Sequence, residues 1–386
     1  MEKEYKVMFG LIGAAVTGAE PDPEVIKEAD RQTLESIFKV CRAHSVAQIV
    51  ADVISKYGLL PEDDDLYKKY KSCLVSTIYQ TTLLDHWHGM VMSTLDEAGI
   101  DHIAIKGAAV RKLYAKGFYR NSCDIDILIR ESDLERGVAV LTEKLGMTAK
   151  DKGSHDVSLY YRDKVHVELH YDTVEKGRLS DADGLLSRIW EHAVPVSGHE
   201  YALDDEMNYF YLTAHAAKHL INGGCGIKTL TDALVLNRVP GFDREKRDAL
   251  LKDGGLLKFD SAVRALCDHW FYGKDADDTV TRFGEYLLNG GRYGTLENNV
   301  TLKVSKSGKS KYLLSRIFMP YDALKFKYPV LQKHKWLYPF MVVRRIFSLL
   351  DPKVRRRSSN ELKASVNVTK DEETSASDLM SSLGLL

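Results

Sequence analysis

The spacing of apolar residues changes twice along this chain of 386 residues. From about residue 24 to residue 98, apolar residues recur every three or four positions, which is the period of an amphipathic α-helix. From about residue 100 to residue 172 they alternate with polar residues in short runs, which is typical of half-buried strands. After about residue 177 the helical period returns and continues to about residue 350. The pattern therefore predicts a helical unit, an α/β unit and a second helical unit.

The α/β unit contains four alternating runs, which predict strands at residues 103–105, 125–129, 157–159 and 165–169. Between the second and third runs, Ser132 and Glu135 fit a capping box and Gly146 fits a helix end, so one helix is expected there. The expected fold class is therefore α+β, with a small mixed β-sheet core flanked by N- and C-terminal helical units.

These patterns divide the chain into four parts. We expect an N-terminal helical unit at 1–98, the α/β core at 99–175, a C-terminal helical unit at 176–350, and a tail at 351–386 that is first basic and then acidic. From Val366 onward the tail is rich in Ser, Thr, Asp and Glu, a composition that is typical of disorder, although Leu379, Met380 and the final two leucines could fold onto another part of the chain.

Composition limits the class of protein. Lys plus Arg (54) nearly cancel Asp plus Glu (55), so the net charge gives no argument for a nucleic-acid partner, and we expect none. The five cysteines are scattered without a C-x-x-C pair, which fits neither a disulfide framework nor a structural zinc site and favours a reducing cytoplasm. No run of apolar residues approaches the roughly 20 that a spanning helix needs.

One segment departs from this charge balance. Residues 301–363 hold ten Lys and six Arg against two Asp and one Glu. Within this segment, the stretch from Trp336 to Leu350 combines large apolar residues with Arg344 and Arg345. The stretch is compatible with peripheral contact with an anionic membrane and with an ordinary docked helix, which is the favoured interpretation. A basic nucleic-acid or membrane-associated partner protein therefore stays open as an alternative function.

Asp124 and Asp126 are the first candidate functional residues. They lie two positions apart on a predicted strand, so both side chains leave the same face while the isoleucines of this strand point the other way. Adjacent carboxylates repel each other unless a cation neutralises them, and Mg²⁺ prefers such oxygen ligands. The alternative is that the two aspartates form the solvent face of an edge strand.

A third carboxylate and a glycine turn accompany this pair. Glu168 lies on the polar face of a later strand, and it meets Asp124 and Asp126 if the two strands are neighbours. Upstream, the strand ending at Ile105 runs into Lys106-Gly107-Ala108 at the start of a helix, where backbone amides can approach a phosphate. The sequence therefore predicts a metal site beside a phosphate site.

These motifs resemble those of a known superfamily. The small-residue turn, the D-x-D strand and the later acidic residue are similar to those of the DNA polymerase beta-like minimal nucleotidyltransferases. More closely, Lys-Gly-Ala-Ala, an Arg shortly before Asp-Ile-Asp-Ile-Leu-Ile, and Val-Glu-Leu-His resemble a largely uncharacterised bacterial nucleotidyltransferase family over about residues 95–235. Lys106 replaces an apolar residue of the general superfamily pattern and Ala108 replaces Gly or Ser, so a hydroxyl contact to the phosphate is lacking.

The resemblance implies an enzyme that transfers a nucleoside monophosphate from an NTP to a hydroxyl-bearing acceptor and releases pyrophosphate. The catalytic set, which would bind two Mg²⁺ ions or alternatively Mn²⁺, would be Asp124, Asp126 and Glu168. The residues that would bind the NTP phosphates are Lys106, Gly107, Ala108 and Arg120. The acceptor, whether small molecule, saccharide, peptide or protein, stays open. A noncatalytic nucleotide-binding or regulatory protein on the same fold is the alternative.

His215, His219 and Asp232 are similar to the C-terminal helical signature of that family. The two histidines share one helical face, and Asp232 could meet them if it lies on the next helix of a hairpin. We expect this group beside the acceptor, with a packing role inside the hairpin as the alternative. A zinc site is disfavoured, because Ala216 stands where the H-E-x-x-H motif has glutamate.

Overall fold

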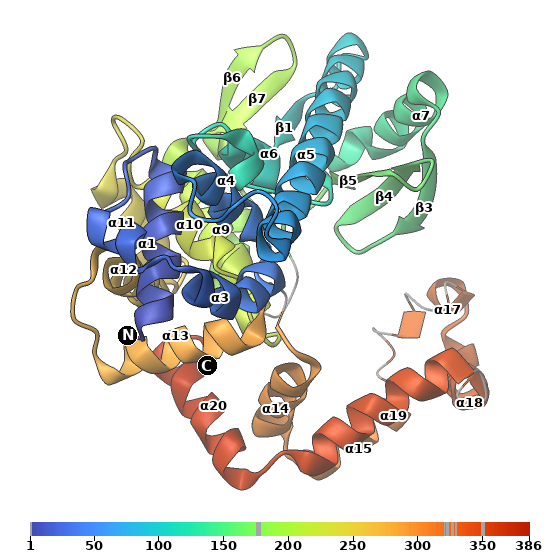
Figure 1. The fold of residues 1–386 in the computed structure, drawn as a ribbon. Helices are drawn as coiled ribbons and strands as arrows, with labels where there is room; N and C mark the ends of the chain where they lie inside the picture. The colour runs from blue at the N-terminus through green and yellow to red at the C-terminus, as the bar shows by residue number, and fades with distance from the viewer. Residues whose placement is uncertain are drawn as a thin grey trace.

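The computed structural model describes residues 2–174, 179–292, 294–319, 321, 324–325, 328, 330–348 and 352–386. The unit boundaries expected at residues 175, 176, 350 and 351 lie outside these ranges. In the described part of the chain, helices flank one seven-stranded mixed sheet, which confirms the α+β fold class (Figure 1). Within the same part, no helix is both long and apolar enough to cross a membrane.

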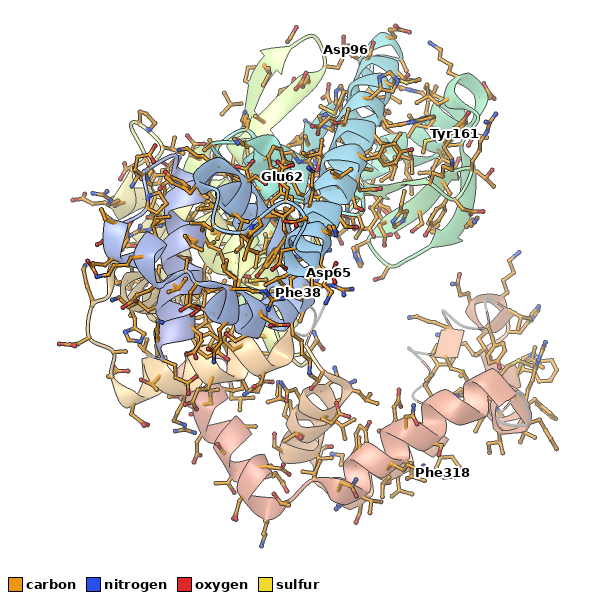
Figure 2. The ribbon with its side chains drawn as sticks, viewed as in Figure 1. Phe38, Glu62, Asp65, Asp96, Tyr161 and Phe318 are labelled. Carbon is orange, nitrogen blue, oxygen red and sulfur yellow. The ribbon has the colours of Figure 1, made fainter. Side chains whose placement is uncertain are left out.

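Three of the five N-terminal helices begin at aspartate caps. Asp22, Asp30 and Asp64 each accept a hydrogen bond from a backbone N–H of the following first turn, which satisfies a donor that the helix leaves unpaired. The helices are α1 (Lys3–Thr17), α2 (Pro23–Glu28), α3 (Arg31–Ala43), α4 (Ala47–Tyr57) and α5 (Asp65–Glu97). The long α5 runs beside the sheet, where Tyr161 lies against it with its ring 4.3 Å from that of Trp87 (Figure 2).

The sheet has the strand order β3-β4-β5-β2-β1-β7-β6. Its strands are β1 (His102–Ala104), β2 (Ile125–Ile129), β3 (Thr148–Lys152), β4 (Asp156–Tyr161), β5 (Val165–His170), β6 (Ala193–Ser197) and β7 (Glu200–Leu203). Strands β2 and β5 pair in parallel, as do β1 and β7, and the other neighbours are antiparallel. The two strands that carry the candidate carboxylates are therefore direct neighbours in the middle of the sheet.

Three of these strands were not expected from the sequence. Strand β3 contains only one apolar residue, Ala149, so it has no alternating pattern to detect. Strands β6 and β7 form a hairpin at the edge of the sheet, in which Val194 and Val196 are exposed and Pro195 interrupts the pattern. Proline is acceptable there because β6 is an edge strand, with one side free of ladder hydrogen bonds.

The helix expected inside the α/β unit is α7 (Leu134–Leu145), but the expected capping box is wrong. Ser132 lies in a short 3-10 turn, Glu131–Asp133, and no side chain caps α7. The expected end is confirmed, because Gly146 adopts the left-handed conformation with φ 64°. Before α7 come the short helix α6 (Lys106–Arg111) and the 3-10 turn η1 (Gly117–Tyr119).

The helices that follow the sheet share a core with the N-terminal helices. They are α8 (Ser180–Leu186), α9 (Asp205–Leu220), α10 (Lys228–Leu236), α11 (Arg244–Asp253), α12 (Leu257–Tyr272) and α13 (Asp278–Gly290). Phe9 of α1 stacks on Trp270 of α12 with ring centroids 4.0 Å apart, inside one large apolar cluster. The two helical regions on either side of the sheet in sequence thus pack together in space.

The remaining helices follow α13 in the sequence; the first and the last of them contact this core, and those between extend away from it (Figure 1). The remaining helices are α14 (Leu296–Ser307), α15 (Lys309–Ile317), α17 (Val330–Lys333), α18 (Tyr338–Phe347), α19 (Pro352–Asn367) and α20 (Lys370–Ser382). The expectation of a disordered tail from Val366 is wrong for α20, which begins with a capping box between Thr369 and Glu372. Its Leu379 and Met380 are buried in the main core, because these two apolar residues share one face of an otherwise polar helix.

Candidate active site

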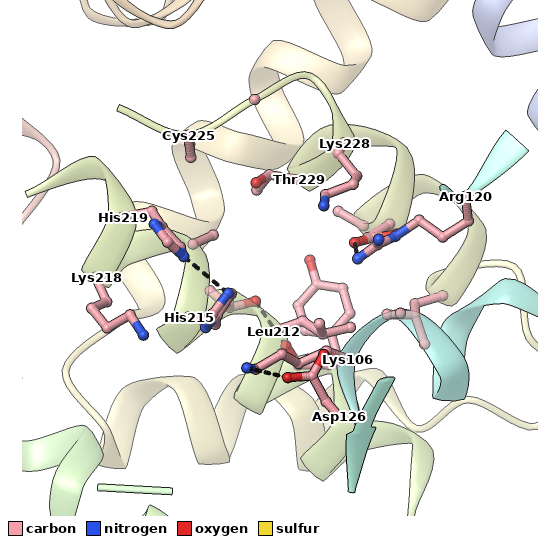
Figure 3. A pocket seen from close by; sticks show the side chains of 18 of the residues that line it. Lys106, Arg120, Asp126, Leu212, His215, Lys218, His219, Cys225, Lys228 and Thr229 are labelled. Carbon is pink, nitrogen blue, oxygen red and sulfur yellow. Dashed lines mark hydrogen bonds and ion pairs between the residues drawn. The ribbon is translucent and has the colours of Figure 1, made fainter. Parts of the chain in front are cut away.

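A cavity of about 330 Å³ lies between the central strands of the sheet and helices α9 and α10 (Figure 3). Asp124, Asp126 and Glu168 line its sheet side, and Lys106 and Gly107 line it from the start of α6. The turn, the D-x-D strand and the third acidic residue are therefore brought together in one place.

Strand register explains the approach of the carboxylates. Asp126 of β2 is the direct partner of Glu168 of β5 in the parallel ladder, and Asp124 lies just before β2. Ligand atoms of Asp124, His166 and Glu168 lie within 4.8 Å of one another, as do those of Asp126, Glu168 and His170. Glu168 belongs to both groups, so the carboxylate set has the compactness that one or two small cations require.

A lysine ammonium occupies part of this carboxylate cluster. Lys106 Nζ lies 2.6 Å from Asp126 Oδ1 and 3.6 Å from Glu168 Oε2. The Lys106 backbone has φ 53°, a left-handed conformation that L residues rarely adopt, at the junction of β1 and α6. Lys106 therefore neutralises these carboxylates in this structure. To bind a phosphate, as expected from the sequence, it would have to leave them.

His170 completes the cluster from the end of β5. Its Nε2 lies 3.0 Å from Asp126 Oδ1 and 3.3 Å from Glu168 Oε2, so a single ring contacts both carboxylates. Burial and Lys106 act to lower the pKa of His170, but hydrogen bonds to Asp126 and Glu168 outweigh them and raise it. His170 thus contacts both carboxylates with one nitrogen and helps to orient them.

The two aspartates differ in their electrostatic surroundings. Burial acts to raise the pKa of Asp126, but Lys106 and His170 outweigh it and hold the pKa below its usual value. Burial, together with repulsion from Asp126 and Glu168, raises the pKa of Asp124. Asp124 is therefore the carboxylate with the greatest electrostatic need for an added cation.

The turn after β1 depends on its glycine. A Cβ added to Gly107 would lie 3.2 Å from Ser122 Cβ, so only glycine fits without movement of the neighbouring loop. Gly107 lines the cavity, whereas Ala108 lines a separate surface hollow with Arg111 and Gly117. The geometry thus supports Gly107, more than Ala108, as the backbone contact to a ligand.

Arg120 is engaged in a buried ion pair. Its Nε and Nη2 donate to the Asp232 carboxylate at 2.6 and 2.8 Å, and Tyr114 Oη donates to the same group at 2.6 Å. Both members of the pair are buried. Because the bidentate contact uses the donors that a phosphate would need, we do not retain Arg120 as a triphosphate ligand. Asp232 lines the same cavity as His215 and His219, and its carboxylate binds Arg120.

His215 and His219 line the cavity from α9. Their Nε2 atoms lie 3.0 Å apart, which is the expected consequence of their spacing on one helical face (Figure 3). Burial and the nearby Lys106 hold the pKa of His215 well below its usual value, so this ring is neutral. The pair faces the same space as the carboxylates across the cavity.

Lys228 is a cavity residue that the sequence did not indicate. It begins α10, and its side chain points into the cavity (Figure 3). Burial, with repulsion from Arg120 and Arg292, lowers the pKa of Lys228 to about 7. Its one signal in the sequence is weak, because a lysine in the first turn of a helix is opposed by the helix dipole but belongs to no motif.

Comparison with known proteins places the chain in a class. The model of a family described as uncharacterised nucleotidyltransferase matches residues 30–272, more than half of the chain. The chain belongs to this nucleotidyltransferase family, which confirms the resemblance and supports nucleotidyl transfer as its general activity. The matched range runs from the start of α3 to the end of α12 and includes the whole sheet. No curated protein and no solved structure matches the chain.

Proposed function

We propose that the protein is a metal-dependent nucleotidyltransferase that moves a nucleoside monophosphate from an NTP to a hydroxyl group and releases pyrophosphate. The observation that carries this proposal is the grouping of Asp124, Asp126 and Glu168 in a cavity beside the Gly107 turn. Membership of the nucleotidyltransferase family supports the same chemistry.

The donor set fits a hard divalent cation. Three carboxylates supply oxygen ligands, which suit Mg²⁺ or Mn²⁺, and they converge where Lys106 now balances part of their charge. Asp124, Asp126 and Glu168 would hold one or two ions, which supply charge stabilisation for the phosphoryl group and for the attacking and leaving oxygens. An ammonium in the cluster is consistent with this role, since it shows that the site accommodates positive charge.

The protein's own residues would then act on both substrates. Gly107 would offer its backbone N–H to the NTP phosphates, and Lys228 would face their negative charge from α10. Lys106, once released from Asp126, would be a further phosphate cation. Glu168 would accept the proton of the acceptor's hydroxyl group. The hydroxyl oxygen would form the bond to the α-phosphorus as the bond from that phosphorus to pyrophosphate breaks.

The acceptor would enter from the α9 side of the cavity. His215 and His219 face the carboxylates there, and the neutral His215 can hydrogen-bond a hydroxyl group. A small molecule, a saccharide, a peptide or a protein remains compatible with this wall. A cytoplasmic location fits the five free cysteines, since thiols persist in a reducing compartment.

A noncatalytic nucleotide-binding protein is the second candidate, because Lys106 is already paired with Asp126. Calorimetric titration with each NTP measures its affinity in Mg²⁺ and in EDTA. It tests whether NTP binding requires a metal, which holds for the proposed enzyme and for a noncatalytic protein that uses the same metal site. We expect one NTP to bind with at least about tenfold higher affinity in Mg²⁺. Equal affinity with and without metal would contradict the proposed metal site.

A further inference from the structure

One face of α18 is apolar and exposed in the described structure. Its exposed side chains are Trp336 (68%), Phe340 (61%), Val343 (50%) and Phe347 (65%), which we name the α18 stripe. They are spaced by four, three and four residues, so they lie along one side of α18 and the turn that precedes it. The rings of Trp336 and Phe340 contact each other edge to face at 6.3 Å.

The opposite face of α18 is apolar as well, and it is covered. Val342 is buried with Leu324 and Leu331 in a small core of their own, and Tyr338 and Met341 pack against it. A helix that is apolar on both sides is normally covered on both sides. The small core accounts for one face, so the α18 stripe requires a partner outside the described residues.

The surroundings of the stripe are strongly basic. Residues 323–350 contain four Lys and two Arg and no Asp or Glu. Lys333, Lys335 and Arg344 are exposed next to or within the stripe. Large aromatic side chains flanked by Lys and Arg match the two regions of an anionic membrane surface, its acyl boundary and its phosphates.

We propose that the α18 stripe docks the protein onto the surface of an anionic lipid bilayer. The helix lies parallel to the surface, with Trp336, Phe340 and Phe347 in the headgroup region and the lysines on lipid phosphates. With ten residues, α18 is too short to cross the bilayer. Figure 1 shows α17 and α18 at the end of α15 and α19 that points away from the main helical core.

A second copy of the chain fits the stripe less well. A two-fold interface would bring the same surface of both copies together, and each copy carries these basic residues without an acidic residue between 323 and 350. Like charges at such an interface repel each other. An anionic bilayer satisfies both the apolar and the charged parts of the surface.

Sedimentation of the full-length protein with lipid vesicles tests the proposal. We expect binding to phosphatidylcholine vesicles that contain about 30% phosphatidylglycerol, little binding to pure phosphatidylcholine, and weaker binding as salt rises. The double variant F340S/F347S should lower the partition coefficient about tenfold or more, because two exposed rings no longer insert. K333Q/K335Q should reduce the difference between the anionic and neutral vesicles.

A matched control removes equally exposed apolar side chains elsewhere. V75S/Y79S changes two residues of α5 that are 58% and 64% exposed, and it should bind vesicles as the wild type does. Unchanged melting temperatures would show that all variants are folded. The proposal is overturned if the wild type ignores anionic vesicles, if F340S/F347S binds them normally, or if the stripe instead mediates a dimer that F340S/F347S dissociates. The result does not depend on nucleotide binding, so it is independent of the proposed catalytic function.

Discussion

At the scale of single residues, Asp124 offers the cleanest test of the carboxylate cluster. Its pKa is raised by burial and by the neighbouring Asp126 and Glu168, so its charge opposes folding at neutral pH. Asp124→Asn should therefore keep or raise the melting temperature while lowering nucleotidyl transfer by about 10²-fold or more. Calorimetry and turnover on the same preparation measure both effects. A large loss of melting temperature would show that Asp124 has a structural role instead.

Asp126 gives the matched contrast. Asp126 is 3% exposed and pairs with Lys106 and His170, so Asp126→Asn removes one member of a buried ion pair and leaves only Glu168, at 3.6 and 3.3 Å, in contact with the other two side chains. Removal of one member of such a buried pair costs about 3 kcal/mol of unfolding free energy. Loss of activity in Asp126→Asn alone would thus be ambiguous, whereas loss in Asp124→Asn with unchanged stability points to the chemistry.

Lys228 predicts a pH dependence of NTP affinity. With a pKa of about 7, the ammonium is charged below pH 7 and becomes neutral as the pH rises. If it binds phosphate, the Kd for NTP should rise between pH 6.5 and 8.5. Lys228→Met should weaken binding about tenfold at pH 6.5 and flatten this pH dependence, because a charge-assisted contact is lost. An unchanged pH profile in Lys228→Met would remove Lys228 from the phosphate site.

At the scale of secondary-structure elements, the sequence predicts the site better than it predicts its surroundings. In β2 and β5 a buried apolar face alternates with the positions of Asp126 and Glu168; the opposite face of β2 is buried as well, whereas that of β5 is partly exposed. The sequence predicts that the carboxylates meet only if these two strands are neighbours, and the parallel pairing of β2 with β5 confirms that they are. The β6–β7 hairpin has no such buried face, and the Ser132 cap fails because a 3-10 turn forms where the capping box would be.

Long-range pairs were beyond the reach of sequence patterns. Arg120 and Asp232 are separated by 112 residues, and neither belongs to a spacing that identifies the other. From the sequence alone, Arg120 is interpreted as a phosphate ligand and Asp232 as a partner of the histidines. Only tertiary packing, which brings the residue after η1 to α10, decides that they bind each other.

The Arg120–Asp232 pair should hold the α/β unit to the helices that follow it. Asp232→Asn leaves the guanidinium buried without its charged partner, so we expect a loss of about 3–5 kcal/mol in unfolding free energy. Urea unfolding measures this loss. As a control, Glu35→Gln removes an exposed i,i+4 pair with Arg31 and should cost less than about 0.5 kcal/mol. Similar losses of unfolding free energy in both variants would contradict the idea that the buried pair holds the two parts together.

At the scale of the whole molecule, His44 joins the N-terminal helices to the C-terminal ones. The Ile227 backbone N–H donates to His44 Nδ1, and Nε2 lies 3.0 Å from the Leu288 carbonyl oxygen. Because Nδ1 accepts, Nε2 must carry the hydrogen that bonds to Leu288, and the ring is neutral. Burial lowers the pKa of His44 in agreement with this tautomer.

The stability of the fold should therefore fall in acid. Below pH 6.5 the unfolded chain takes up a proton that folded His44 resists, so the unfolding free energy decreases as the pH falls toward the folded pKa. The limit is about 1.4 kcal/mol per pH unit for one such group. His44→Gln preserves an acceptor and a donor but cannot titrate, and it should reduce the slope of unfolding free energy between pH 7 and 5. An identical slope would show that other groups, such as His88 and His215 with their lowered pKa values, dominate.

The bond that the protein breaks in an NTP decides what the molecule does. NTPs labelled on either the α- or the γ-phosphate, incubated with Mg²⁺ and a cell extract that supplies small molecules, saccharides, peptides and proteins as acceptors, distinguish nucleotidyl transfer from phosphoryl transfer. We expect the α label to appear in a new product, the γ label to leave as pyrophosphate, and both events to be lost in Asp124→Asn. Transfer of the γ label, transfer that survives Asp124→Asn, or metal-dependent NTP binding without any product would contradict a nucleotidyltransferase built on Asp124, Asp126 and Glu168.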